Sequence, residues 1–226
     1  MATSAAKGKN ELLALLSQLN ISAHTVEHPE VYTVEEALPH TNGLPGVFAK
    51  NLFLKDKKKS LWLFCAPHDL DVKLNDLAKL VGVPGGFRFA DEAALHTVLG
   101  VRQGAVTLFG LVNDVSHQVK LILDESFWEE GKTDGSIKET TKTENKLEKD
   151  CDPITETLDK MQVTTEGKGS SPGLIIQDEE HASQHRIYFH PLVNSASTGI
   201  TLLELKQFLA YTGHEPIVVK CLSKKI

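Results

Sequence analysis

Apolar and polar residues alternate around residue 50 in the pattern of a β-hairpin. In residues 51–54 the two leucines fall on one face of a strand, while Asn51 and Phe53 fall on the other. The polar pair 56–57 predicts a turn, and the continuous apolar run 61–66 predicts a returning strand buried on both faces. We therefore take this hairpin as the element around which the chain is organised.

Apolar residues three or four positions apart predict helices on both sides of the hairpin. Asn10 is the expected cap of the first, and the Thr-x-x-Glu spacing at Thr33 and Thr201 is a capping-box signature. Glycine or proline is expected to end several of them. The predicted helices cover residues 10–20, 33–39, 74–82, 91–100 and 201–213.

Short apolar runs predict further strands between and after these helices. They cover residues 23–28, 87–89, 104–110, 119–123, 186–189 and 217–222. The run 104–110 has glycine at both ends, which predicts a strand whose backbone approaches another group closely. Because strands and helices are mixed without regular βαβ alternation, we expect an α+β fold with a mixed sheet in a single domain spanning residues 1–226.

One segment does not fit the domain pattern. Residues 131–173 contain no aromatic residue and are rich in Thr, Lys, Glu and Gly. Such a composition buries too little apolar surface to offset the entropy of ordering the chain. We expect a flexible low-complexity insertion in the domain.

Composition and charge narrow the function classes. The net charge of −6 argues against a general nucleic-acid binder, so any RNA contact must come from a local basic patch. Lys50, Lys55 and the run Lys57, Lys58 and Lys59 form the obvious candidate. Three widely spaced cysteines, no secretory signal and no apolar run long enough to span a membrane predict a cytoplasmic protein with reduced thiols.

Two patterns suggest chemistry that we weigh and set aside. Residues 169–173 match the G-x-S-x-G pattern around Ser171, the basis of a serine-esterase hypothesis, but no strand-to-helix elbow is expected there. The pairs His24/His28 and His181/His185 have i, i+4 spacing, yet no clustered ligand set accompanies them. We expect neither a metal nor a cofactor.

Lys50 and His190 remain as candidates from pattern alone. A lysine before an apolar strand is usually just solvated, and a histidine at a strand end often only closes the strand. Pro191 holds His190 in an extended backbone, and its near-neutral pKa suits proton transfer or hydrogen bonding to a polar substrate.

A resemblance to a known family favours the functional interpretation of both. Lys50-Asn51-Leu52-Phe53-Leu54 is similar to the Lys-Asn-Leu-Phe-Leu signature of the YbaK/prolyl-tRNA synthetase-associated editing domains. Further similar motifs follow in the family's order from about residue 21 to residue 219, the insertion apart. They lie at residues 75–79, 88–92, 188–191 and at Asn194 ahead of Gly199. The free-standing eukaryotic form of the family is the most similar.

The resemblance implies a curled, partly barrel-like mixed sheet flanked by helices, with the site in a cleft against the sheet. It also implies hydrolysis of the ester that joins a wrong amino acid to the 3′-terminal adenosine of tRNA-Pro. No protein nucleophile is required, because fixed donors and an oriented water suffice. Lys50 would hold the terminal nucleotide, and His190 would border the amino-acid pocket. The other implied pocket residues are Asn51, Gly104, Gly110 and Asn194, and the implied partners are the tRNA acceptor end and prolyl-tRNA synthetase.

Two departures from the family pattern affect the expected substrate. Phe48 stands where many members carry histidine, and Thr107-Leu108 stands where Ser-Pro is common. We include Phe48 and Thr107 among the candidate substrate-binding residues for this reason. Alanyl-tRNA-Pro is the leading substrate and cysteinyl-tRNA-Pro the alternative. A non-catalytic module that binds the tRNA acceptor end or the synthetase is the hypothesis from another class.

Overall fold

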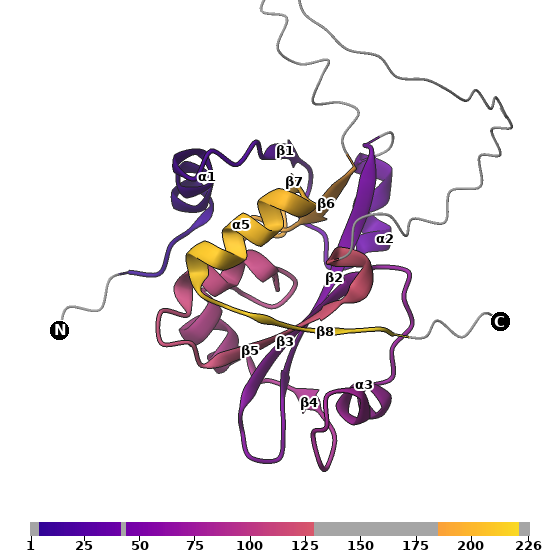
Figure 1. The fold of residues 1–226 in the computed structure, drawn as a ribbon. Helices are drawn as coiled ribbons and strands as arrows, with labels where there is room; N and C mark the ends of the chain where they lie inside the picture. The colour runs from indigo at the N-terminus through magenta and orange to yellow at the C-terminus, as the bar shows by residue number, and fades with distance from the viewer. Residues whose placement is uncertain (1–4, 42–43, 129–184, 222–226) are drawn as a thin grey trace, which may run out of the picture.

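The computed structural model describes residues 5–41, 44–128 and 185–221 as a mixed β-sheet flanked by helices (Figure 1). The strands are β1 (His24–Glu27), β2 (Gly46–Lys55), β3 (Leu61–Pro67), β4 (Arg88–Phe89), β5 (Val119–Asp124), β6 (Arg186–Phe189), β7 (Ala196–Thr201) and β8 (Pro216–Val219). The helices are α1 (Lys9–Gln18), α2 (Val34–Ala37), α3 (Leu74–Leu80), α4 (Glu92–Ala94) and α5 (Leu202–Thr212). Four short turns of other helix types complete the list: η1 (Leu38–His40), η2 (Leu95–Leu99), η3 (Leu108–Asn113) and η4 (Glu125–Phe127).

The predicted hairpin lies at the centre of the sheet. The strand order is β1-β7-β6-β2-β3-β5-β8, and β4 pairs with β2 beside this path. The β2–β3 pair is antiparallel, whereas β2–β6, β3–β5 and β5–β8 are parallel. The mixed sheet, the flanking helices and the single domain confirm the expected fold class. The sheet itself is open and does not close into a barrel.

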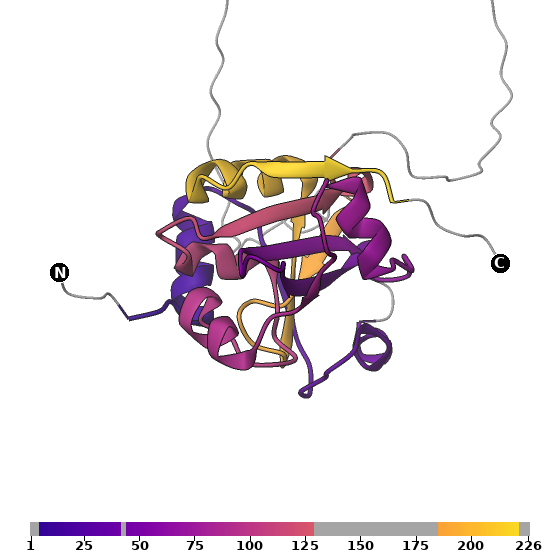
Figure 2. The same cartoon turned by 90° about the horizontal axis from the view of Figure 1, so that it is seen from below.

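Alternation along β2 divides the apolar interior in two. Ala49 and Phe53 point into the larger cluster, which α1 and α5 also enter. Leu54, fully buried, points into the smaller cluster on the α3 side. Figure 2 shows α1 and α3 at opposite ends of the molecule, with the hairpin between them. Both faces of the hairpin are therefore covered, as its apolar composition predicts.

Two predictions about local structure were wrong. The cap of α1 is Gly8 and not Asn10, because the Glu11 side chain accepts a hydrogen bond from the Gly8 N–H and begins the helix earlier. Residues 104–110 form a loop and the start of η3 instead of a strand. Thr107 Oγ1 accepts the Phe109 N–H at 3.2 Å, which starts a helical turn.

Strand β7 was not predicted at all. Its sequence, Ala-Ser-Thr-Gly-Ile-Thr, is small and polar and lacks an apolar alternation. The strand is nevertheless almost wholly buried, because it pairs with both β1 and β6. Gly199 is required there, since a Cβ would lie 2.5 Å from the Tyr188 ring. The predicted insertion at residues 131–173 and the G-x-S-x-G pattern lie outside the described residues.

Candidate active site

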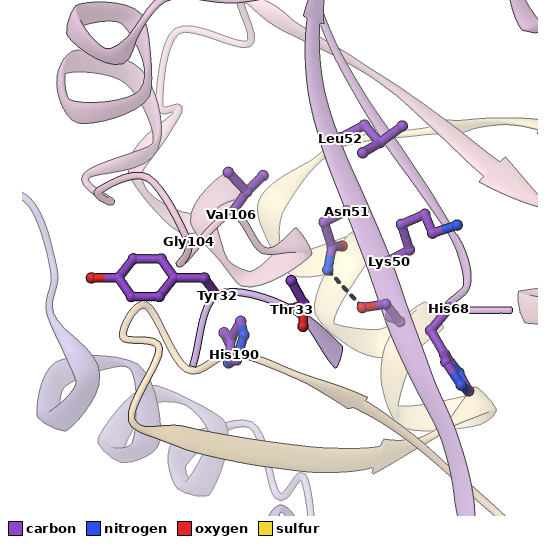
Figure 3. A pocket seen from close by; sticks show the side chains of 10 residues that line it. Tyr32, Thr33, Lys50, Asn51, Leu52, His68, Gly104, Val106 and His190 are labelled. Atoms are coloured by element: carbon purple, nitrogen blue, oxygen red, sulfur yellow. Dashed lines mark hydrogen bonds between the residues drawn. The ribbon is translucent and has the colours of Figure 1, made fainter. Parts of the chain in front are cut away.

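A pocket opens where the edge of β2 has no neighbouring strand. β2 pairs with β6 only at residues 46–48 and with β4 only at residues 54–55. Between these two segments, residues 49–52 line a pocket of about 320 Å³ (Figure 3). The remaining lining residues come from four other segments: Tyr32 and Thr33, His68, Gly104 and Val106, and His190. The gap in strand pairing thus creates the pocket.

His190 is held in one tautomer at the end of β6. Its Nδ1 donates a hydrogen bond to the Ala196 carbonyl at 3.0 Å. Its Nε2 has no hydrogen-bond partner among the described residues. Burial lowers the His190 pKa below its ordinary value, and the nearby His28 ring, 6.2 Å away, lowers this pKa further. At neutral pH the ring is therefore uncharged, with the lone pair on Nε2 free to accept.

Asn51 presents an unused acceptor beside the pocket. Its Nδ2 donates to the Ala49 carbonyl at 3.3 Å, while its Oδ1 is buried without a partner. A buried unpaired carbonyl costs about 1–3 kcal/mol, so a ligand that donates to it is favoured.

The Asn51 backbone also faces the open edge. The carbonyls of Ala49 and Phe53 both point to the side away from β3, because they accept from the Asn51 side chain and from Ala90. The backbone N–H and C=O groups of successive residues in a strand point to opposite sides. Asn51 is two residues from both Ala49 and Phe53, so its N–H points to the same side as their carbonyls, away from β3. The site therefore has a backbone donor as well as side-chain acceptors.

Lys50 leaves β2 in the opposite direction from Asn51 (Figure 3). Its Nζ donates to the Leu70 carbonyl at 2.7 Å, which fixes the ammonium group at the rim of the pocket. His68 lines the same side, and its Nδ1 is buried without a partner. The cation thus lies apart from His190, on the other side of β2 (Figure 3).

Asn194 supports the pocket wall from behind. Its Nδ2 donates to the Val31 carbonyl at 3.0 Å, and its backbone carbonyl accepts the Val31 N–H at 3.0 Å. These bonds attach the segment before α2 to the β6–β7 loop. Asn194 therefore positions Tyr32 and does not itself line the pocket.

The structure brings together Lys50, Asn51, Gly104 and His190 and places other candidates elsewhere. Phe48 is buried and stacks on Tyr188 with ring centroids 5.0 Å apart. Thr107 is fully buried, and Gly110 is buried in η3. None of these three lines the pocket.

The remaining lysine candidates lie around the hairpin tip. Lys55 forms an ion pair with Asp91 at 3.0 Å. A second pocket of about 710 Å³ is lined by Lys55, Lys57 and Lys59 together with Arg88. Lys58 is exposed at the turn. Sequence reasoning thus missed Arg88, as it missed Tyr32, Thr33, His68 and Val106 in the first pocket.

The described residues contain neither a membrane-spanning helix nor a metal-binding cluster. Within them, no helix has the length and apolar character needed to cross a bilayer. Likewise, no group of three or more His, Cys, Asp or Glu side chains in the described ranges is placed to hold a metal ion.

Comparison with known proteins identifies the family. Residues 28–143 match the model of the aminoacyl-tRNA editing domain. The chain is 37% identical over 213 residues to prolyl-tRNA synthetase associated domain-containing protein 1 of Xenopus laevis, covering 93% of this chain and 95% of the relative. The Bos taurus protein of the same name is 36% identical, covering 92% and 95%. The chain therefore belongs to the aminoacyl-tRNA editing domain family.

A further curated relative and a solved structure are also similar to this chain. The prolyl-tRNA editing protein ProX of Acetoanaerobium sticklandii is 33% identical over 119 residues, which are 52% of this chain and 72% of that protein. A crystal structure described as a candidate trans-editing enzyme for prolyl tRNA synthetase shares the fold with a TM-score of 0.53. Its sequence is 16% identical, and the match covers 97% of this chain and 99% of that one.

Proposed function

We propose that this protein is a trans-editing deacylase that hydrolyses the aminoacyl ester of mischarged tRNA-Pro, with alanyl-tRNA-Pro as its main substrate. The observation that carries the proposal is the pocket at the open edge of β2. It combines a fixed cation, an uncharged histidine acceptor and the unpaired Asn51 carbonyl. The relation to a prolyl-tRNA editing protein supports the choice of tRNA.

The reaction needs positioned donors and acceptors more than a nucleophile. An aminoacyl ester is already reactive, so orienting a water and stabilising the developing oxyanion is sufficient. Cys65 is not a competing nucleophile, because it is fully buried and burial raises the pKa of its thiol. The proposed reaction also requires no metal or cofactor.

We assign the acyl group to the inner part of the pocket. There, His190 Nε2 and Asn51 Oδ1 are acceptors without partners, suited to the α-ammonium group of the substrate or to the attacking water. The Asn51 N–H is the proposed donor to the ester oxygen. Gly104 lines the same pocket, so its backbone is a second candidate for this contact.

The tRNA is assigned to the outer part. Lys50, held at the rim by Leu70, would contact the terminal nucleotide or its phosphate. Lys55, Lys57, Lys58 and Lys59 extend the positive charge along the hairpin and would contact the acceptor backbone, a contribution that weakens with salt. Prolyl-tRNA synthetase is the proposed protein partner, in keeping with the names of the vertebrate relatives, and the cytoplasm is the proposed location.

The deciding experiment is hydrolysis of alanyl-tRNA-Pro. Purified protein in catalytic amounts should release free alanine well above the spontaneous rate of ester hydrolysis. The same protein with correctly charged alanyl-tRNA-Ala provides the specificity control. Release at only the spontaneous rate, with tRNA binding intact, would favour a non-catalytic binding module instead.

The pH dependence of the reaction should report His190. Its uncharged form is the proposed acceptor, and its pKa lies below the ordinary 6.5. We expect kcat/KM to stay level as pH falls to about 6.5 and to decrease at lower pH, as protonation removes the lone pair on Nε2. Spontaneous hydrolysis is subtracted at each pH.

His190→Asn provides the control for this profile, since asparagine does not titrate. His28, His68 and Lys50 also face the pocket or the His190 ring and remain unchanged in this variant. The low-pH decrease should therefore disappear in the residual activity of His190→Asn. An identical decrease in the variant would assign the titration to another group.

A further inference from the structure

Tyr32 is a large aromatic side chain left exposed at the wall of the pocket. Its exposed fraction is 65%, although it lines the same pocket as His190 and Asn51. Figure 3 shows the ring at one end of the pocket, with its hydroxyl group directed away from Lys50. A single exposed aromatic residue is ordinary on a protein surface, so the question is whether this ring is held in place.

The backbone on both sides of Tyr32 is fixed by hydrogen bonds. Val31 is bonded in both directions to Asn194, and the Tyr32 N–H donates to the Glu36 carboxylate at 2.8 Å. Thr33 Oγ1 accepts the Glu36 N–H at 3.3 Å. The ring therefore projects from a segment attached both to the β6–β7 loop and to the start of α2.

The ring itself rests on Gly104. A Cβ at this position would lie 2.8 Å from Tyr32 Cδ1, so the absence of a side chain allows the ring to pack against the backbone. Gly104 also has a φ of +87°, which favours glycine. One part of the ring is thus supported, while most of its surface remains open to a ligand.

We propose that the Tyr32 ring is a stacking platform for a purine base, namely the terminal adenine of the tRNA whose ester enters the pocket. This inference rests on the proposed function, because it places the nucleoside that carries the ester. Aromatic side chains bind unpaired bases by stacking, and a ring that is already held loses little conformational freedom on binding. The phenyl ring, and not the hydroxyl group, carries the interaction.

Binding of uncharged tRNA-Pro with 2-aminopurine in place of the terminal adenine tests the proposal without hydrolysis. Stacking quenches 2-aminopurine fluorescence, so the wild-type protein should lower the emission. Tyr32→Phe should preserve this quenching. Tyr32→Leu should remove it and raise the Kd roughly 5- to 100-fold, with the salt dependence of binding unchanged because no charge is lost. Tyr211→Leu, an exposed tyrosine on α5, is the matched control and should behave as wild type.

A tRNA-Pro that lacks its terminal adenosine identifies which base is bound. Wild-type protein and Tyr32→Leu should bind this shortened tRNA equally. A Kd difference as large as that for intact tRNA would overturn the assignment to the terminal base. If the intact tRNA binds without quenching, the stacking proposal fails and the proposed deacylase activity is unaffected. If quenching occurs but alanine is not released from alanyl-tRNA-Pro, only the proposed deacylase activity fails. A wild-type protein that does not bind tRNA would overturn both.

Discussion

Replacing Lys50 with alanine is expected to lower kcat/KM for alanyl-tRNA-Pro by roughly 100-fold or more. The ammonium group is the fixed cation at the rim of the pocket, held by the Leu70 carbonyl. Its loss removes a charged contact to the terminal nucleotide and leaves the ester poorly positioned. Stability should change little, because one partly exposed hydrogen bond is worth only about 1 kcal/mol. Single-turnover hydrolysis and thermal unfolding of the same variant measure the two effects.

Lys79→Ala is the matched control for this variant. Lys79 is an exposed lysine on α3, and within the described residues its ion pair is with Asp76 of the same helix. The Lys79→Ala variant should retain full activity, and this result would exclude a general effect of net charge on the reaction. Lys50→Arg keeps the charge but changes the shape of the cation, so it should recover part of the rate. Near-normal hydrolysis by Lys50→Ala would remove the central residue of the proposed site.

Local signals in the sequence were enough to predict the framework of the fold. The alternation in residues 51–54 and the apolar run after the turn gave the β2–β3 hairpin and both of its buried faces. The capping box at Thr201 gave the start of α5, where Thr201 and Glu204 bond to each other's backbone N–H groups. Such features depend on residues close in sequence, so pattern alone could identify them.

Of the two parts that were missed, one depends on long-range contacts and the other on a single local hydrogen bond. β7 is buried because two strands flank it, a condition that its small polar residues do not reveal. Residues 104–110 looked like a strand from their apolar content, but the Thr107 side chain begins a helical turn. Strand pairing thus made β7 a strand in spite of its low strand propensity, whereas a side-chain hydrogen bond turned residues 104–110 away from the strand that their propensity favours.

The candidate site likewise combines residues that a local motif identifies with residues that only the fold brings to them. Lys50, Asn51 and His190 were identified from motifs, and the pocket brings them together. Tyr32 and His68 carry no motif, and only the gap between β6 and β4 along β2 makes them neighbours of these residues. The position of Tyr32, an aromatic residue just before a capping box, was a signal in the sequence. The exposure of the Tyr32 side chain could not be inferred from this position.

The pocket should hydrolyse the alanyl ester faster than the cysteinyl ester, and the prolyl ester slowest of the three. The whole pocket, at about 320 Å³, is larger than any of these acyl groups, so total volume cannot select among them. Selection must arise where the acyl group touches fixed walls. Among the lining residues, we assign this contact to Ala49, Val106 and the His190 ring, which its bond to Ala196 holds in place.

Proline differs from alanine both in size and at its nitrogen. Its ring replaces one N–H of the α-ammonium group with a methylene, which removes a donor from the proposed contact with His190 Nε2 and Asn51 Oδ1. The two N–H groups that remain must then serve two acceptors in one fixed orientation, with the methylene beside these polar atoms. Binding sites strongly reject a substrate that leaves such an acceptor poorly paired. Cysteine keeps all three N–H groups and adds only a thiol. A small size difference of this kind gives about 1–3 kcal/mol, or roughly 10- to 200-fold.

Deacylation of alanyl-, cysteinyl- and prolyl-tRNA-Pro under one set of conditions measures this order. Asn51→Asp retains an acceptor oxygen and should keep the preference for alanine over proline, whereas Asn51→Leu should lose activity on alanine and narrow that preference. Faster hydrolysis of the cysteinyl ester would make cysteinyl-tRNA-Pro the substrate instead. Comparable hydrolysis of the prolyl ester would rule out an editing function, because a protein that removes correctly attached proline works against the synthetase it would serve.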